Sequence, residues 1–244
     1  MKNINRQSLF WWMVAAWGLA ILMYFPSLNA SLSSDDYRAA NQVGQVSSFW
    51  SIFTQAEMNM FYRPVYKAIL YLVGIHILPL RILSVIFHCA AVAVVILAGK
   101  EIFESIPGLE KASTIGGGVA GLIFAVFPRQ NETVVWIASI NQLLTAICFW
   151  GAVIIVIRYL RSPQPRRLVI LFFLMVAGFL TKENMAAFPA VAAVIVFYYS
   201  YKNPSASRLP ARIRQTIFHP TVLLTAAATI VYIALRLMYF HGLG

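Results

Sequence analysis

Two adjacent carboxylates, Asp35 and Asp36, directly follow the first long apolar run of the sequence. A carboxylate in such a place could take the proton of an attacking hydroxyl as a general base, or could help to bind a metal ion. A pair of acidic side chains at a helix exit is also a common solvated cap. The two residues alone leave both interpretations open.

A second pair of ionisable residues, Lys182 and Glu183, interrupts the apolar stretch 168–200. As one helix this stretch would be about 50 Å long, against a hydrocarbon core of roughly 30 Å, so the chain must fold back at 181–184. Ionisable side chains below a membrane surface are costly unless they face a cavity or a partner, which makes this pair a candidate site. The alternative is a buried pair that merely closes the turn.

The elements that position these residues follow from the composition, which excludes a water-soluble globule. Of 244 residues, 60% are hydrophobic and 11% are charged, against about 25% charged in soluble domains. Long apolar runs predict an all-α, polytopic membrane protein that forms one module, residues 1–244. The net charge of +11 comes from short basic clusters between these runs, which we interpret as orientation signals rather than a nucleic-acid surface. Cys89 and Cys148 lie within apolar runs and indicate no disulfide framework.

About seven transmembrane helices are predicted. They cover residues 9–28, 81–99, 114–128, 133–157, 168–181, 184–200 and 221–238. The stretch 64–80 is also apolar, but it carries Lys67 and His76, and a span there would turn the basic clusters at 158–167 and 202–214 outward. With 64–80 on the membrane surface, 12 of the 19 basic residues fall on the cytoplasmic side together with the N-terminus. This distribution satisfies the positive-inside rule.

The same topology gathers polar residues on the outer side. The largest loop, about 29–80, is expected there, with surface-lying amphipathic helices. Five of the eight acidic residues fall on this side: Asp35, Asp36, Glu57, Glu132 and Glu183. The other three, Glu101, Glu104 and Glu110, lie beside basic residues in a cytoplasmic loop, where we expect them to be solvated and structural.

Other candidate motifs favour structural roles. The glycines at 116, 117, 118 and 121 look superficially like a phosphate-binding loop, but they lie within a predicted membrane helix and have the spacing of close helix packing. His76 and His88 have no second histidine at ligand spacing, so we expect hydrogen-bonded structural histidines. The sequence contains no zinc, Walker or nucleophile-elbow motif.

Four short motifs occur in a fixed order along nearly the whole chain. They are Asp35-Asp36-Tyr37, Tyr62-Arg63-Pro64, the run from Phe127 to Ser139, and Thr181-Lys182-Glu183. This order resembles the polytopic glycosyltransferases of the GT-C fold that use polyprenyl-phosphate-linked sugars, especially their protein O-mannosyltransferase and TMTC-like branches. The conserved module of that family likewise has seven helices and a large first outer loop.

The resemblance implies transfer of a sugar from a polyprenyl-phosphate carrier to a protein, glycan or lipid acceptor on the outer face, with inversion at the anomeric carbon. Asp35 and Asp36 are the candidates for the catalytic base, and Asp35 is preferred because it aligns with the leading acid of the family motif. The departing phosphate needs cations nearby. The candidates for binding it are Lys182, Arg236 and Arg63. Supporting or acceptor-side roles are expected for Glu132, Asn131, Glu183 and Arg129. No residue is assigned to a metal, although a divalent ion could take part.

Two other classes of protein stay open. A transporter or flippase of lipid-linked substrates would also place ionisable residues within the membrane, but the sequence shows no second copy of the Asp-Asp or Lys-Glu motif. A non-catalytic remnant of an enzyme module is the third interpretation. Because the chain stops after the seventh predicted helix, we expect a truncated or minimal module that needs further chain or a partner. We expect it to lie among the lipids of a bacterial inner (cytoplasmic) membrane, with its N-terminus in the cytoplasm.

Overall fold

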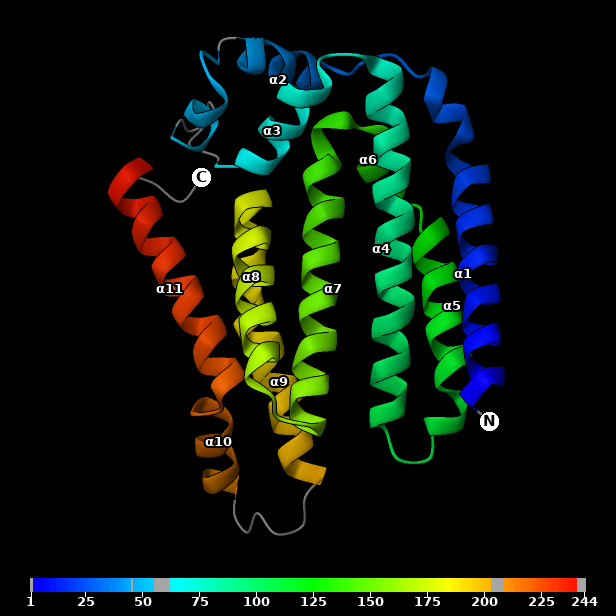
Figure 1. Cartoon of the computed structure of the whole chain (residues 1–244), viewed down its shortest axis with the longest axis vertical. Coiled ribbons are helices and arrows are strands. Elements are labelled where there is room, and N and C mark those ends of the chain that lie inside the picture. The colour runs from blue at the N-terminus through cyan, green and yellow to red at the C-terminus, as the bar shows by residue number, and fades with distance from the viewer. Residues whose placement is uncertain (1, 45, 55–61, 203–208, 241–244) are drawn as a thin grey trace.

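The computed structural model describes residues 2–44, 46–54, 62–202 and 209–240, which form helices and no strands. The long helices stand side by side in a bundle (Figure 1). They are α1 (Lys2–Tyr24), α4 (Ile77–Ser105), α5 (Ser113–Val126), α7 (Ile140–Arg161), α8 (Pro165–Thr181), α9 (Phe188–Lys202) and α11 (Pro220–Phe240). The predicted all-α polytopic membrane fold is thereby confirmed.

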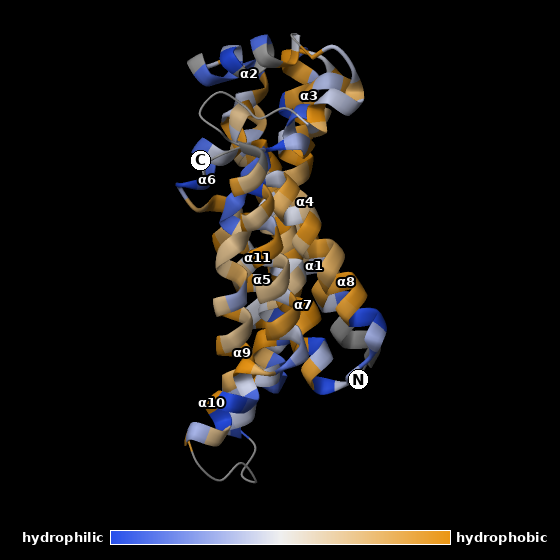
Figure 2. Ribbon diagram, turned by 90° about the vertical axis from the view of Figure 1, so that its left-hand side faces the viewer, coloured by the Kyte–Doolittle hydropathy of each residue, from blue (hydrophilic) through white to orange (hydrophobic). Residues whose placement is uncertain are grey.

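Length and hydropathy identify the helices that could cross a membrane. In the described part of the chain there are five such segments: Gln7–Asn29, Ile77–Ser105, Ile137–Arg161, Glu183–Lys202 and Pro220–Met238. Helices α5, with 14 residues, and α8, with 17, are shorter but stand in the same bundle. Hydrophobic residues dominate the middle of the bundle and hydrophilic residues gather towards its ends (Figure 2). Because α5 and α8 are too short to be identified as spans by length, the total of seven spans remains a prediction.

Short helices from the first long loop cover one end of the bundle, which we call the upper end from its place in Figure 1. They are η1 (Phe25–Asn29), α2 (Ser34–Gly44), η2 (Phe49–Phe53) and α3 (Pro64–Val73). Helix α3 begins at Pro64, whose ring fixes φ near the helical value. It ends before Gly74, which has φ 71°, a left-handed conformation that favours glycine. Residues 64–73 are thus a separate short helix, whereas residues 77–80 of the predicted surface stretch belong to α4.

The other short elements connect helices of the bundle. They are η4 (Glu110–Ala112), α6 (Gln130–Val135), η5 (Ile137–Ser139), η6 (Glu183–Ala187) and α10 (Leu209–Ile217). The predicted span 133–157 is wrong at its start, because α6 and η5 occupy its first residues and α7 begins at Ile140. The extended backbone of Trp136 separates α6 from η5, and a hydrogen bond from the Ala138 amide to Asp36 holds η5 against α2.

Helices α1, α4 and α5 pack closely at the glycines of α5. A methyl group on Gly117 would lie 2.5 Å from the carbonyl oxygen of Ile96, and one on Gly121 would collide with the Ile96 side chain. A methyl group on Gly118 would collide with Trp12 of α1. The glycines therefore allow the helices to approach each other, and their predicted packing role is confirmed.

The other half of the bundle has its own core. Helices α7, α8, α9 and α11 share a cluster of buried side chains that includes Met175, Phe188 and Ala192. A separate buried cluster joins α1, α4 and α5, and contacts between α4 and α7 link the two halves. His88 of α4 is fully buried and its Nε2 lies 3.1 Å from the Ala125 carbonyl oxygen, as expected of a structural histidine.

Ion pairs tie α4 to α7 at the lower end of the bundle. Arg158 Nε lies 2.7 Å from Glu101 Oε1, and Arg161 Nη1 lies 2.6 Å from Glu101 Oε2 and 3.2 Å from Glu104 Oε2. The structural role predicted for Glu101 and Glu104 is confirmed. The prediction that Glu101 is solvated is wrong, because the packing of α4 against α7 buries it.

Candidate functional site

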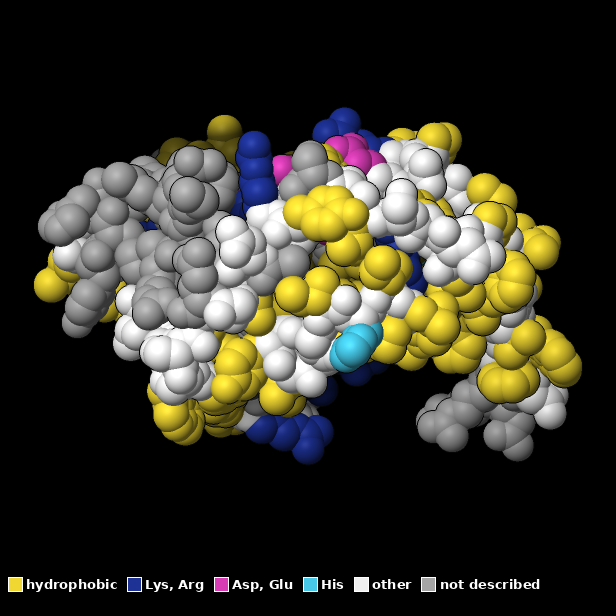
Figure 3. Space-filling view, turned by 90° about the horizontal axis from the view of Figure 1, so that it is seen from above, with side chains coloured by type: hydrophobic (Ala, Val, Ile, Leu, Met, Phe, Trp, Pro, Cys, Tyr) yellow, Lys and Arg dark blue, Asp and Glu magenta, His cyan; other side chains and the backbone are white. Residues whose placement is uncertain are grey.

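An ion pair joins the start of α3 to the break between α8 and α9. Arg63 precedes α3, and its Nη2 lies 3.1 Å from Oε1 of Glu183, the first residue of η6. Both side chains are largely buried, at 17% and 27% exposure. The pair brings together two of the motifs predicted to act at one site, although 120 residues separate them in the sequence. The surface of the upper end as a whole also carries basic and acidic side chains, some of them beside one another near one edge of the molecule (Figure 3).

Lys182 lies between α8 and η6, where the backbone is extended. Helix α8 ends at Thr181, and Lys182 has φ −162° and ψ 144°, so the chain turns back where the sequence predicted. Glu183 forms its ion pair with Arg63, and among the described residues no ion pair joins it to its neighbour Lys182. Burial and the nearby Arg63 guanidinium lower the pKa of Lys182, while the Glu183 carboxylate raises it. The fold therefore holds two cations close to one carboxylate.

Arg236, near the end of α11, is buried although it is charged. It is 2% exposed, and its Nη1 donates a hydrogen bond to the Tyr232 hydroxyl oxygen, 3.0 Å away. The Tyr232 ring stacks on Phe179 of α8, with centroids 4.3 Å apart. Electrostatic interactions link Tyr232 to Arg63 and Glu183. Arg236 thus belongs to the same group of side chains as the Arg63–Glu183 pair.

A cavity of about 580 Å³ lies between α8, α11 and the upper loop. Most of its lining is apolar, and its polar lining groups include Tyr62, Tyr232 and Arg236. Both α8 and α11 run from the lower to the upper end (Figure 1), so Phe172 and Ala228 line its lower part and Arg236 its upper part. Such an arrangement suits an amphiphile whose chain lies against apolar side chains and whose head group meets the polar ones.

The two adjacent carboxylates have different surroundings. Asp36 is 4% exposed: its Oδ1 accepts a hydrogen bond from the Ala138 amide at 2.8 Å, and its Oδ2 accepts two from the Ser33 amide and hydroxyl. Asp35 carries a carboxylate that is 46% exposed and lies 3.6 Å from Arg38. Helix α3 contacts both α2, which carries this pair, and α8, which leads to Lys182. The described hydrogen bonds and ion pairs of the two carboxylates are with Ser33, Ala138 and Arg38, and not with Arg63 or Arg236.

Three further residues take part in these two groups and were not predicted from the sequence. Trp136 donates a hydrogen bond to the Ser33 hydroxyl, which itself donates to Asp36. Arg81 is 2% exposed, donates to the Ser31 carbonyl oxygen at 2.8 Å and interacts electrostatically with Asp36. Tyr232 is the third. A cation at the start of an apolar run was the available signal for Arg81, and Trp136 lies within the motif from Phe127 to Ser139, whereas Tyr232 resembled an ordinary interfacial aromatic.

The predicted acceptor-side residues of the central motif lie elsewhere. Arg129, Asn131 and Glu132 are exposed at the start of α6. In the described part of the chain, none of their side chains forms an ion pair or hydrogen bond with the Arg63–Glu183 group. Glu57 lies outside the described residues. The described residues also contain no group of three His, Cys, Asp or Glu side chains that could hold a metal ion.

Comparison with known proteins gives one distant similarity. The chain is 24% identical over 182 residues to the protein O-mannosyl-transferase Tmtc1 of Drosophila melanogaster. The matched part covers 68% of the chain and 20% of that protein, so the chain spans about a fifth of the length of the relative it matches. No protein-family model and no solved structure matches it. In coarse terms the similarity points to a membrane glycosyltransferase.

Proposed function

We propose that this chain is a GT-C-type module that transfers a sugar from a polyprenyl-phosphate carrier to an acceptor, which by analogy with the matched relative is a protein. The observation that carries the proposal is the apolar cavity between α8 and α11 that ends at Tyr62, Tyr232 and Arg236. A polyprenyl chain needs an apolar surface and its phosphate needs cations, and this part of the fold offers both.

The donor phosphate is held by Arg236 and Lys182 in this proposal. The departing phosphate leaves as an anion, and cations fixed in a poorly hydrated site stabilise it without reorganising. The Tyr232 hydroxyl orients Arg236 through the 3.0 Å hydrogen bond. The lowered pKa of Lys182 shows that burial and Arg63 disfavour its charge, and a bound phosphate would relieve this cost.

The Arg63–Glu183 pair organises the site from the other side. Glu183 uses Oε1 to hold Arg63, whereas its Oε2 is buried without a hydrogen-bond partner among the described residues. A buried carboxylate oxygen of this kind would accept a hydrogen bond from a hydroxyl, and a sugar carries several. Glu183 thereby orients Arg63 and binds the sugar.

Asp35 is the catalytic base in this proposal, and Asp36 holds the start of α2 in place. A base must be accessible to the acceptor hydroxyl, and the carboxylate of Asp35 is open while that of Asp36 is fully engaged. Attack from the side opposite the phosphate inverts the anomeric carbon. The exposed Arg129, Asn131 and Glu132 contact the acceptor, and the upper end faces the extracytoplasmic side.

Donor binding to the whole chain in proteoliposomes tests the proposal. We expect binding of polyprenyl-phosphate mannose to the wild type, and Arg236→Gln and Lys182→Gln to weaken it about tenfold each, because each removes a charge-assisted contact with the phosphate. Lys111→Gln is the matched control, since Lys111 is an exposed cation at the lower end. Absence of donor binding in the wild type, or equal binding in all four proteins, would contradict the proposal.

A further inference from the structure

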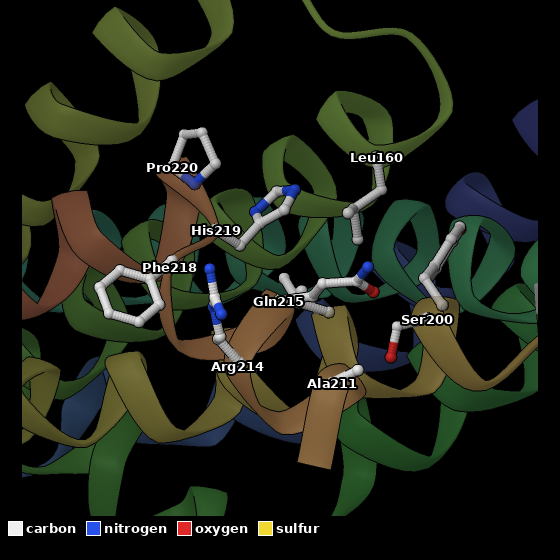
Figure 4. A pocket seen from close by; sticks show the side chains of 10 residues that line it. Leu160, Ser200, Ala211, Arg214, Gln215, Phe218, His219 and Pro220 are labelled. Atoms are coloured by element: carbon white, nitrogen blue, oxygen red, sulfur yellow. The ribbon is translucent and has the colours of Figure 1, made fainter. Parts of the chain in front are cut away.

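A second cavity, of about 1040 Å³, lies at the lower end of the bundle, away from the proposed donor site. It opens between the ends of α7 and α9, helix α10 and the start of α11. Its lining includes Arg214, Gln215, Phe218 and His219. Figure 4 shows the Arg214 side chain extending from α10 towards His219, with Phe218 and Gln215 on either side.

The polar side chains of this cavity are available to a ligand. Arg214 and Gln215 form no side-chain hydrogen bond or ion pair with any other described residue. His219 Nδ1 lies 2.9 Å from the Thr221 hydroxyl oxygen and 3.4 Å from the Thr221 amide nitrogen, so Thr221 engages Nδ1 and Nε2 is left for a ligand. Burial lowers the pKa of His219 and favours the neutral ring. The cavity therefore combines a guanidinium, an amide and an imidazole N–H, all of which can donate to an anion.

The surrounding charges favour an anionic ligand. No acidic residue lines the cavity, and the segment 202–219 contains none. Two acidic residues of α4 at this end, Glu101 and Glu104, are neutralised by ion pairs with Arg158, Arg161 and Lys100. The Tyr199 hydroxyl on the cavity wall is already hydrogen-bonded to Ser105. The positive charge of Arg214 is therefore uncompensated among the described residues.

The helix that carries Arg214 also exposes apolar side chains. Phe218 lines the cavity and is 66% exposed. Leu209, Ile213 and Ile217 of α10 do not line it, but they are 61%, 45% and 52% exposed on the same short helix. A short helix that combines such side chains with arginines is typical of the interface between lipid head groups and acyl chains. A soluble anion would gain nothing from these apolar groups, whereas a lipid would cover them.

We infer that this cavity binds the phosphate head group of an anionic phospholipid from the adjacent membrane leaflet, with its acyl chains leaving past Phe218 towards the exposed apolar side chains of α10. Arg214 contacts the phosphate, and Gln215 and His219 donate further hydrogen bonds. The site is independent of the proposed sugar transfer, because it lies at the opposite end of the bundle and shares no residue with the α8–α11 cavity.

Native mass spectrometry of the whole chain in detergent, titrated with phosphatidylglycerol or phosphatidylcholine, tests this inference. We expect the wild type to bind phosphatidylglycerol about tenfold more tightly than phosphatidylcholine, and Arg214→Gln to abolish this preference. Arg166→Gln is the matched control, because Arg166 is an exposed arginine at the same end that does not line the cavity. Arg166→Gln should retain the preference.

Two results would overturn the inference. One is a wild type without head-group preference, or an equal loss in Arg214→Gln and Arg166→Gln, which would mean that the cavity adds nothing to the general surface charge. The other is displacement of phosphatidylglycerol by inorganic phosphate at comparable concentration, which would assign the cavity to a free anion. Arg214 is exposed, so Arg214→Gln should fold normally, and an unchanged thermal midpoint verifies this.

Discussion

At the scale of single residues, two neighbouring carboxylates differ because one of them completes a helix cap. Ser33 precedes α2, and Asp36, three residues later, accepts a hydrogen bond from the Ser33 amide. This contact, from the side chain of the third helical residue back to the amide that precedes the helix, is one half of a capping box. The Ser-x-x-Asp spacing is visible in the sequence, so the structural role of Asp36 could have been predicted from it. Its contact with Ala138 could not, because it joins residues 102 apart.

Exchange of each carboxylate for its amide should separate the two roles. Asp36→Asn places an NH₂ group where backbone amides donate, so we expect unfolding to become easier by about 1–3 kcal/mol. Asp35→Asn changes an exposed, loosely paired group, so stability should stay within about 0.5 kcal/mol while turnover falls about 100-fold or more. Thermal unfolding and single-turnover transfer measure the two effects.

The pair also serves as its own control, since both substitutions remove one negative charge from adjacent positions. If Asp35→Asn retained full turnover, Asp35 would not be the base. If Asp36→Asn unfolded at the wild-type temperature, the hydrogen bonds at Asp36 would not stabilise α2.

At the scale of elements, close packing depends on the absence of side chains in α5. A methyl group on Gly117 would lie 2.5 Å from Ile96 O and 2.9 Å from Lys100 N, which are backbone atoms of α4 and cannot rotate away. We expect Gly117→Ala to destabilise the protein by about 1–3 kcal/mol, as overpacking does. Denaturant unfolding in detergent, followed by tryptophan fluorescence, measures the change.

Gly18 of α1 provides the matched control. A methyl group there has no atom within 4 Å, so Gly18→Ala should leave stability unchanged or raise it by up to about 1 kcal/mol. Equal unfolding midpoints for the two variants would contradict the packing role of Gly117.

The elements also show how far the sequence predicts the fold. Bilayer thickness limits helix length, so the turn after Thr181 could be placed from the apolar run alone, and the structure has it there. The beginning of α7 could not be placed, because the break at Trp136 depends on a tertiary contact between η5 and α2. In the candidate site, too, some features follow from the sequence and others depend on tertiary contacts. Lys182, Glu183 and Arg236 were predicted from charge within apolar sequence, but the pairing of Glu183 with Arg63 depends on how the upper loop folds over the bundle.

At the scale of the whole molecule, the two ends of the bundle differ in charge. The lower end carries the α4–α5 and α7–α8 connections, with Lys111, Arg166 and Arg167. The upper end carries the short helices of the first loop and the Arg63–Glu183 pair. Loops rich in Lys and Arg are retained in the cytoplasm, so this asymmetry predicts that the lower end faces the cytoplasm and the upper end faces outward.

Cysteine labelling in intact cells checks this orientation. Cys89 and Cys148 are free, so both are first replaced by alanine. Ser47→Cys, between α2 and η2, should then react with a membrane-impermeant maleimide from outside, because Ser47 is exposed at the upper end. Ser162→Cys, exposed between α7 and α8, should react only after the cells are permeabilised. Reaction of Ser162→Cys in intact cells would reverse the orientation, and the proposed donor site would then face the cytoplasm.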